Sequence, residues 1–233
     1  MNINNTQKVA IVAGVGQGLG LALCRRLLEQ GYAVGGLSRK AEPQPKLGDK
    51  YLAIECDITD KSSVDHAIST MENSFGTVSV YIHNAAYLIH KSFLETSERD
   101  FTSIWKVSCI GALFGIQRVL PNMLVNKKGT ILVSGATASI KASAEFAAFA
   151  SAKFALRGLT QSLAREFGSQ GIHVAHIILD GAIWGWQAEH KFGREWDECL
   201  QPNAIADNYL HLINQHRSAW TQELDMRPDV ESF

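Results

Sequence analysis

The fold of this chain is decided near its start, by the stretch Val9-Ala10-Ile11-Val12-Ala13-Gly14-Val15-Gly16-Gln17-Gly18-Leu19-Gly20. Its first five residues are apolar and predict a buried strand, and an amphipathic helix is predicted over residues 19–30. A strand, a glycine loop and a helix in this order are the context of a dinucleotide-binding loop. The alternative is that the glycines form only a turn at the end of a strand.

Three glycines of this loop have separate predicted roles. Gly14 permits a tight turn, Gly18 lets a pyrophosphate approach bare backbone, and Gly20 lets the helix pack close to the sheet. The first turn of the helix also offers unpaired N–H groups and a partial positive charge to phosphates. We therefore expect a nucleotide to bind at this loop.

Composition sets limits on the class of protein. The chain has 233 residues, which suits one large α/β domain, and 46% of them are hydrophobic, unlike a disordered chain. A formal net charge of -1 gives no general basic field for nucleic acid. The four cysteines are scattered, so neither a zinc site nor a disulfide framework is predicted. The polar first residues and the lack of a long apolar run predict a cytoplasmic protein without a signal peptide or membrane span.

The rest of the chain is predicted to alternate strands with helices. Strands are expected at residues 9–13, 32–37, 51–56, 78–83, 129–134 and 172–179. Helices are expected at residues 19–30, 61–75 (with Asp60 as N-cap), 98–126 and 145–167. Residues 41–50 contain two prolines and predict a loop with at most one helical turn. This order predicts one domain over residues 1–233. Its expected fold is a Rossmann-type, doubly wound parallel sheet of about seven strands in a three-layer αβα arrangement, with ligands at the carboxyl ends of the strands.

Several motifs occur in the order and spacing of a known family: Ala13-Gly14-x-x-x-Gly18-x-Gly20, Asp57, Asn84-Ala85-Ala86, Lys153 and Asp180-Gly181-Ala182-Ile183. On these motifs the chain resembles the short-chain dehydrogenase/reductase family over nearly its whole length. The resemblance implies that Asp57 contacts adenine, that Lys153 binds the nicotinamide ribose, and that Asn84 steadies the sheet beside the cofactor. The whole implied cofactor-binding set is Gly14, Gln17, Gly18, Leu19, Gly20, Ser38, Arg39, Lys40, Asp57, Ile58, Asn84, Ala85, Ala86, Lys153, Gly181 and Ile183.

Ser38-Arg39-Lys40 lies where a dinucleotide fold selects its cofactor, at the end of the second predicted strand. An acid there favours NAD, whereas an arginine accommodates the 2′-phosphate of NADP. After this strand, the first acidic residue is Glu42. NADP is therefore the expected cofactor. The alternative is that Arg39 and Lys40 are ordinary solvent-exposed charges and that the cofactor is NAD.

The catalytic positions depart from the family pattern. The family's chemistry uses a tyrosine whose pKa a lysine lowers, a serine that binds the carbonyl oxygen, and an asparagine in a proton relay. These positions are here Phe149, Ala136 and Ser108, and the tyrosine position of the enoyl-reductase variant is Phe146. The chain thus resembles a branch of largely unassigned function with phenylalanine at the tyrosine position. The candidate catalytic residues are Lys153, Thr137, Ser108 and Phe149.

Each candidate also has a structural interpretation. Phe149 and Lys153 lie on one helix stripe, where they can be a packing residue and a snorkelling charge. Thr137 can present its hydroxyl to a substrate oxygen or serve as an ordinary turn residue. Tyr87 can replace the missing phenol, although an exposed loop tyrosine is the simpler interpretation. The histidines show no metal-binding pattern, so no metal is expected.

Three of the five tryptophans, Trp184, Trp186 and Trp196, follow Gly181. The resemblance implies a flexible substrate lid in this region, here around residues 184–210. Aromatic density there favours an apolar or planar ligand, and a subunit contact is the alternative. The helix over residues 145–167 is apolar on two faces, which predicts a homodimer or homotetramer.

Two functions are compatible with the sequence. The first is an NADP-dependent oxidoreductase that transfers hydride to or from a carbonyl- or hydroxyl-type small molecule, with altered proton delivery. The second is an NADP-binding protein without turnover, either a sensor or an inactive partner subunit. Fold resemblance does not decide between them. We favour the oxidoreductase because the cofactor motifs are intact, and we expect neither nucleic acid nor a membrane as a partner.

Overall fold

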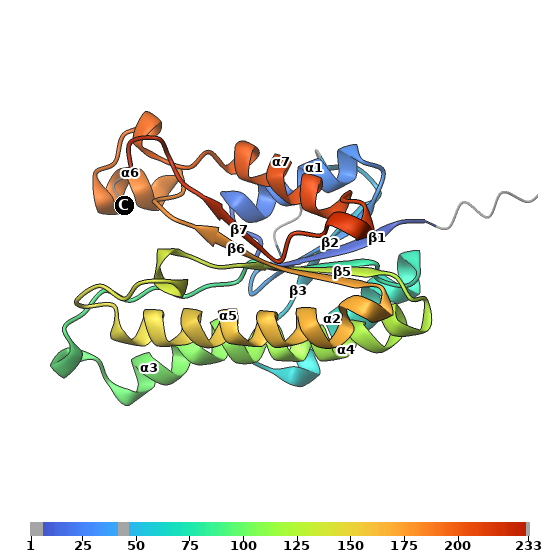
Figure 1. The fold of residues 1–233 in the computed structure, drawn as a ribbon, viewed down its shortest axis with the longest axis horizontal. Coiled ribbons are helices and arrows are strands. Elements are labelled where there is room, and N and C mark those ends of the chain that lie inside the picture. Colours follow the sequence, from blue (N-terminus) through green and yellow to red (C-terminus); the bar gives the residue numbers. More distant parts are fainter. Residues whose placement is uncertain (1–6, 42–46, 232–233) are drawn as a thin grey trace, which may run out of the picture.

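Seven parallel strands form one sheet at the centre of the molecule (Figure 1). The computed structural model describes residues 7–41 and 47–231, and within them the strand order is β3-β2-β1-β4-β5-β6-β7. The strands are β1 (Val9–Ala13), β2 (Ala33–Ser38), β3 (Tyr51–Glu55), β4 (Val80–His83), β5 (Gly129–Ser134), β6 (Ile172–Leu179) and β7 (Glu223–Met226). The direction of winding reverses between β1 and β4, so the switch point lies beside the glycine loop that follows β1.

Helices cover both faces of the sheet, which confirms the expected three-layer architecture. On one face lie α1 and α7, and on the other lie α2, α4 and α5 (Figure 1). The helices are α1 (Leu19–Glu29), α2 (Lys61–Phe75), α3 (Glu98–Trp105), α4 (Gly111–Val125), α5 (Ala147–Phe167), α6 (Trp186–Phe192) and α7 (Pro202–Ile213).

Each face of the sheet has its own apolar core. Every residue of β1, β5 and β6 is buried, and successive side chains along a strand point to opposite faces. Ile11 and Val133 therefore enter the core beneath α2, α4 and α5, whereas Val12 and Leu132 enter the core beneath α1 and α7. Such continuous apolar strands are what a parallel sheet buried on both faces requires.

The long helix predicted over residues 98–126 contains a change of winding. Between α3 and α4 the chain forms a π-helical turn, Lys106–Ile110. A π turn opens the regular ladder of hydrogen bonds and is frequent at functional sites. This π turn contains Ser108.

The helix predicted to begin at residue 145 begins instead at Ala147, because Glu145 has a left-handed backbone with φ of 66°.

The remaining boundaries lie close to those predicted. Asp60 is the N-cap of α2, and its side chain accepts from the backbone N–H of Ser62 over 3.0 Å. β7 was not located from the sequence, because this edge strand has only four residues and a half-buried pattern. The loop expected at residues 41–50 falls partly outside the described residues, which omit 42–46.

One helical run, Glu98–Val125, is long and apolar enough to cross a membrane by length and composition. Its apolar window is 44% buried, and Ile116, Val119 and Met123 pack into the core of the sheet. The apolar character of this run is therefore explained by its place as a core helix. The run is longer than expected, since the sequence analysis found no long apolar run.

Candidate active site

The glycine loop between β1 and α1 has two crowded glycines and two open ones. A Cβ on Gly14 would lie 2.5 Å from the Ala85 backbone nitrogen, and Gly14 has φ of +95°. A Cβ on Gly20 would lie 2.5 Å from the Gly14 carbonyl oxygen. Around Gly16 and Gly18, by contrast, no atom lies within 4 Å of such a Cβ. The protein's own packing thus requires Gly14 and Gly20, and it leaves the backbone at Gly16 and Gly18 accessible.

Asn84 ties the end of β4 to this loop. Its Nδ2 donates to the Gly14 carbonyl over 2.9 Å, and its Oδ1 accepts from the Ser134 hydroxyl over 3.0 Å. Ser134 in turn pairs with the Tyr209 hydroxyl at 2.8 Å. These hydrogen bonds join the ends of β1, β4 and β5. The adjacent Ala86 is exposed at the same edge.

The ends of β2 and β3 lie side by side and bring Arg39, expected to select the cofactor, near Asp57, expected to contact adenine. Arg39 and Lys40 are exposed, and the Ser38 hydroxyl donates to the Lys40 carbonyl over 2.7 Å. Asp57 accepts from the backbone and hydroxyl of Thr59, and these bonds hold the pKa of its carboxyl below the ordinary value.

A cavity of about 650 Å³ opens beside Arg39 and Asp57 and runs between β3 and α2. Its lining includes Ser63, His66 and Thr70 of α2. The sequence interpretation missed these three positions, because nothing in an ordinary amphipathic helix marks a residue that faces a cavity.

Lys153 is buried under the strand ends, with its side chain directed at β5. Its Nζ donates to the Ser134 carbonyl over 2.8 Å and lies 5.6 Å from the centroid of the Phe149 ring. Burial lowers the pKa of Lys153 to about 8. The lysine and the phenylalanine are thus neighbours, as their spacing predicts, and the ammonium meets an aromatic face where a phenol would offer an oxygen.

Ser108 lies in the π turn and is fully buried. Its hydroxyl and the Nε2 atom of His83 are buried without a hydrogen-bond partner among the described residues. Burial, together with the charge of Lys153, lowers the pKa of His83 to about 3. The backbone of Val107 and Ser108 approaches the His83 ring, so the Ser108 hydroxyl is the buried group that most needs a further partner.

Thr137 and Asp180 meet at the ends of β5 and β6. The Thr137 hydroxyl donates to Oδ1 of Asp180 over 2.5 Å, and Oδ2 of Asp180 lies 3.3 Å from Nη1 of Arg227. Asp180 is only 1% exposed. The sequence analysis included Asp180 in the motif before Gly181 but assigned it no role, because its partners come from distant parts of the chain.

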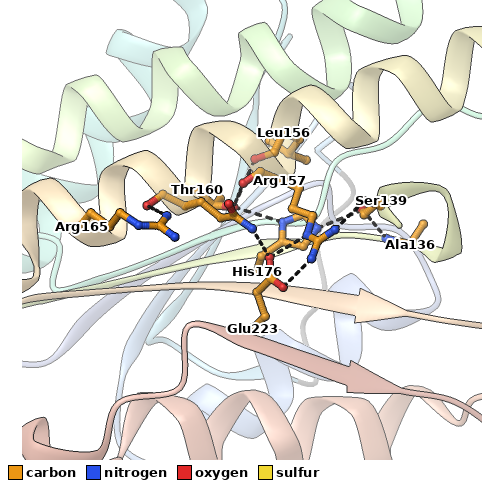
Figure 2. Close-up of polar contacts among 9 residues, drawn as sticks. Ala136, Ser139, Leu156, Arg157, Thr160, Arg165, His176 and Glu223 are labelled. Carbon is orange, nitrogen blue, oxygen red and sulfur yellow. Dashed lines mark hydrogen bonds and ion pairs between the residues drawn. The ribbon is translucent and has the colours of Figure 1, made fainter. Parts of the chain in front are cut away.

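A second polar network links Ser139 and His176 with Arg157 and Glu223 (Figure 2). Ser139 Oγ accepts from the Ala136 backbone N–H over 3.1 Å and pairs with His176 Nε2 at 3.0 Å. Arg157 forms two hydrogen bonds with Glu223, at 2.7 and 2.8 Å, which lower the pKa of that carboxyl to about 2. The network fixes the backbone of the turn that carries Ala136 and Thr137.

The segment after β6 packs against later parts of the chain. Ile183 pairs with Leu200 as an isolated bridge, and Gly181, at φ of +143°, lies against Pro228. Trp186 and Trp196 are 62% and 59% exposed, whereas Trp184 is half-buried.

The range predicted as a lid divides at α7. Ile205, Ala206, Tyr209 and Leu212 of α7 are buried in the core beside α1. A helix that fills the core belongs to the scaffold, so a mobile element would be confined to residues 184–201.

Three further positions complete the predicted set. Leu19 is buried in the first turn of α1, Gln17 is exposed beside it, and Ile58 packs against Gly111 at the start of α4. Tyr87 is 46% exposed in the loop after β4. Among residues 7–41 and 47–231, no group of histidine, cysteine and acidic side chains is arranged to hold a metal ion.

Together these features define an α/β protein of the dinucleotide-binding class, with its candidate site at the switch point of the sheet. Residues 8–182 match the family described as short chain dehydrogenase. The chain belongs to this family of oxidoreductases, which use NAD(P).

Individual relatives agree with this assignment. An uncharacterized oxidoreductase of Staphylococcus aureus is 26% identical over 231 residues, covering 96% of this chain and 98% of that protein. A short-chain dehydrogenase from Rhodopseudomonas palustris is 30% identical with a TM-score of 0.83, over 95% of this chain and 98% of that one. An alcohol dehydrogenase from the archaeon Thermococcus sibiricus, complexed with 5-hydroxy-NADP, is 21% identical with a TM-score of 0.86, over 97% and 98% of the two chains. This last likeness concerns the fold alone.

Proposed function

We propose that this protein is an NADP-dependent oxidoreductase that acts on a carbonyl- or hydroxyl-bearing small molecule through an atypical active site. The observation that carries the proposal is the division within the glycine loop. Gly14 and Gly20 are required by packing, whereas the backbone at Gly16 and Gly18 is accessible at the N-terminus of α1. Free backbone N–H groups at a helix N-terminus fit the pyrophosphate of a dinucleotide.

The preference for NADP rests on charge at the end of β2. Arg39 is exposed there, and no acidic residue precedes it in the turn. Lys153 would hold the nicotinamide ribose, Asp57 the adenine and Ile183 the carboxamide. Once bound, the cofactor would supply hydride transfer, and the side chains of the protein would position the substrate and move the proton.

Calorimetric titration tests the choice of cofactor. We expect NADP(H) to bind at least about tenfold more tightly than NAD(H), a difference of about 1.4 kcal/mol, which is modest for a charge-assisted pair. Arg39→Ala should remove most of the preference, whereas Arg25→Ala removes an exposed charge from α1 and should keep it. Equal affinities of the wild type for the two cofactors would contradict the proposal.

A second candidate function is cofactor binding without turnover. It is favoured by one observation: Phe149 and Ala136 stand at the positions where the family resemblance implies the tyrosine acid and the serine that binds the carbonyl oxygen. A positioned general acid contributes about 10²–10⁴-fold, so its loss impairs the usual chemistry severely. Tight NADPH binding, with no hydride transfer to or from any carbonyl or alcohol offered, would favour this candidate.

A homodimer or homotetramer in the cytoplasm is also proposed. The second apolar face of α5, expected to contact another subunit, is largely covered by the chain itself. Ala150 is buried, and Arg157 forms an ion pair with Glu223. Phe154, 43% exposed, is what this face leaves for a second subunit. Light scattering at micromolar concentration checks the assembly, and a monomer would contradict it.

A further inference from the structure

A hydroxyl and a buried carboxylate meet where two neighbouring strands end. Thr137 follows β5, Asp180 follows β6, and the hydrogen bond between them is 2.5 Å long. The Thr137 hydroxyl donates to Oδ1 of Asp180, and the Arg227 guanidinium forms an ion pair with Oδ2. The carboxylate is almost wholly excluded from solvent. Asp180 is therefore built into the protein as a hydrogen-bond acceptor.

This contact fixes the polarity of Thr137. A hydroxyl has one proton and two lone pairs. Because the proton points to Asp180, Thr137 can offer only a lone pair to any further partner. Thr137 is half-buried and directly follows Ala136, the position that the family resemblance places beside the substrate oxygen. A lone pair at that place accepts from the O–H of an alcohol and gives nothing to the C=O of a carbonyl.

We propose that Thr137, backed by Asp180, takes the hydroxyl proton of an alcohol substrate, which makes alcohol oxidation the favoured direction of this enzyme. The proposal rests on the proposed NADP-dependent function, in which NADP⁺ is the two-electron oxidant and accepts the hydride released when the carbinol C–H bond breaks. The substrate O–H proton passes to Thr137 Oγ1 as the proton of Thr137 passes to Asp180. Thr137 is then a catalytic residue, and Asp180 is a positioning residue that receives the proton through it.

Ala136 and Phe149 strengthen the case for a substitute group. With no serine at Ala136 and no tyrosine at Phe149, Thr137 is the hydroxyl that directly follows Ala136 in the turn after β5. Ser139 lies beyond it and is committed, because its Oγ pairs with His176 and accepts from the Ala136 backbone. A purely structural role is the competing explanation, in which Asp180 only joins β6 to the segment that carries Arg227.

Three variants of the full chain separate these explanations. Thr137→Val removes the hydroxyl at nearly constant shape, Thr137→Ser keeps it, and Asp180→Asn keeps the shape of the carboxylate but offers N–H donors. Thr102→Val, on the exposed surface of α3, is the matched control. With NADP⁺ and the probe 1-phenylethanol, we expect Thr137→Val and Asp180→Asn to lose about 10²–10⁴-fold in kcat. Thr137→Ser and Thr102→Val should stay within about tenfold of the wild type, on the same scale.

A binding experiment without cofactor gives a readout independent of turnover. Saturation-transfer NMR compares 1-phenylethanol with its ketone, acetophenone, on each protein. The wild type should prefer the alcohol by about three- to tenfold, the effect of one neutral hydrogen bond. Asp180→Asn should reverse the preference, because an amide N–H that donates to Thr137 frees the hydroxyl proton for a carbonyl. A structural role for Asp180 predicts weaker folding but no reversal.

The outcomes decide the inference and the proposed function separately. Equal binding of alcohol and ketone to the wild type, an unchanged preference in Asp180→Asn, or binding of neither compound overturns the inference. Full oxidation by Thr137→Val overturns it as well, while leaving the NADP-dependent function in place. Absence of NADP(H) binding overturns the proposed function, and the alcohol preference measured without cofactor still decides the polarity of Thr137.

Discussion

Acidification from pH 7 to pH 5 should destabilise this protein strongly, because three of its histidines, His83, His173 and His176, are buried and have lowered pKa values. The two with the larger shifts, His83 and His176, set the expected magnitude. His83 and His176 are both fully inaccessible to solvent. Burial, with a further contribution from the Lys153 charge, lowers the pKa of His83 to about 3 and that of His176 to about 4. In the unfolded chain both imidazoles regain a pKa of about 6.5.

The sign and size of the effect follow from proton linkage. Below pH 6.5 these imidazoles bind protons in the unfolded state but not in the folded state, so the free energy of unfolding falls as the pH falls. For one histidine that titrates near 6.5 when unfolded and near 4 when folded, the loss between pH 7 and pH 5 is about 2 kcal/mol. The two histidines together give about 4 kcal/mol, a large part of the 5–15 kcal/mol that typically stabilises a domain.

Urea unfolding at pH 7 and pH 5 measures this loss. His176→Gln removes one titrating group while keeping an amide that can reach Ser139 and Thr160, the present partners of the imidazole. We expect the pH-dependent loss in this variant to fall to about 2 kcal/mol. His66→Gln, an exposed position on α2, is the control and should keep the wild-type loss, because its ring meets solvent in both states.

Two results would refute this reasoning. One is a wild-type free energy of unfolding that differs by less than about 1 kcal/mol between the two pH values, which is well under the effect of a single buried histidine. The other is a His176→Gln variant with the full wild-type loss, which would place the acid sensitivity in other groups.

Two further predictions concern the site. The double variant Phe149→Tyr with Ala136→Ser should gain NADPH-dependent reduction of quinones or diketones by at least about tenfold, below the usual general-acid range because Ser108 leaves the relay incomplete. The fall in NADPH absorbance measures the gain. If the double variant binds the cofactor normally but shows no gain in reduction, Phe149 is a core residue. Tryptophan fluorescence should change on NADPH binding and lose part of that change in Trp186→Phe or Trp196→Phe, if the exposed aromatics close over the ligand. A response that neither variant reduces would assign these side chains to an interface.

Local patterns carried most of the fold. The apolar run of β1, the glycines after it and the amphipathic α1 specify their conformations within about twenty residues, since periodicity and backbone freedom are properties of neighbours in sequence. The N-cap at Asp60 and the pairing of Phe149 with Lys153 on one helix face were predictable for the same reason. The short edge strand β7 and the core role of α7 were not, because their stability comes from elements distant in the chain.

The sequence by itself determined the alternating α/β architecture, the place of the glycine loop and the presence of a phenylalanine four residues before Lys153. The tertiary structure alone decided which polar groups meet. Thr137 and Asp180 are 43 residues apart, and they touch because β5 and β6 are adjacent and parallel, so that their carboxyl ends coincide. The approach of the Val107 and Ser108 backbone to the His83 ring likewise depends on how the π turn packs against the end of β4. Strand order and burial determine such contacts, and the residues near each partner in the sequence do not reveal either of them.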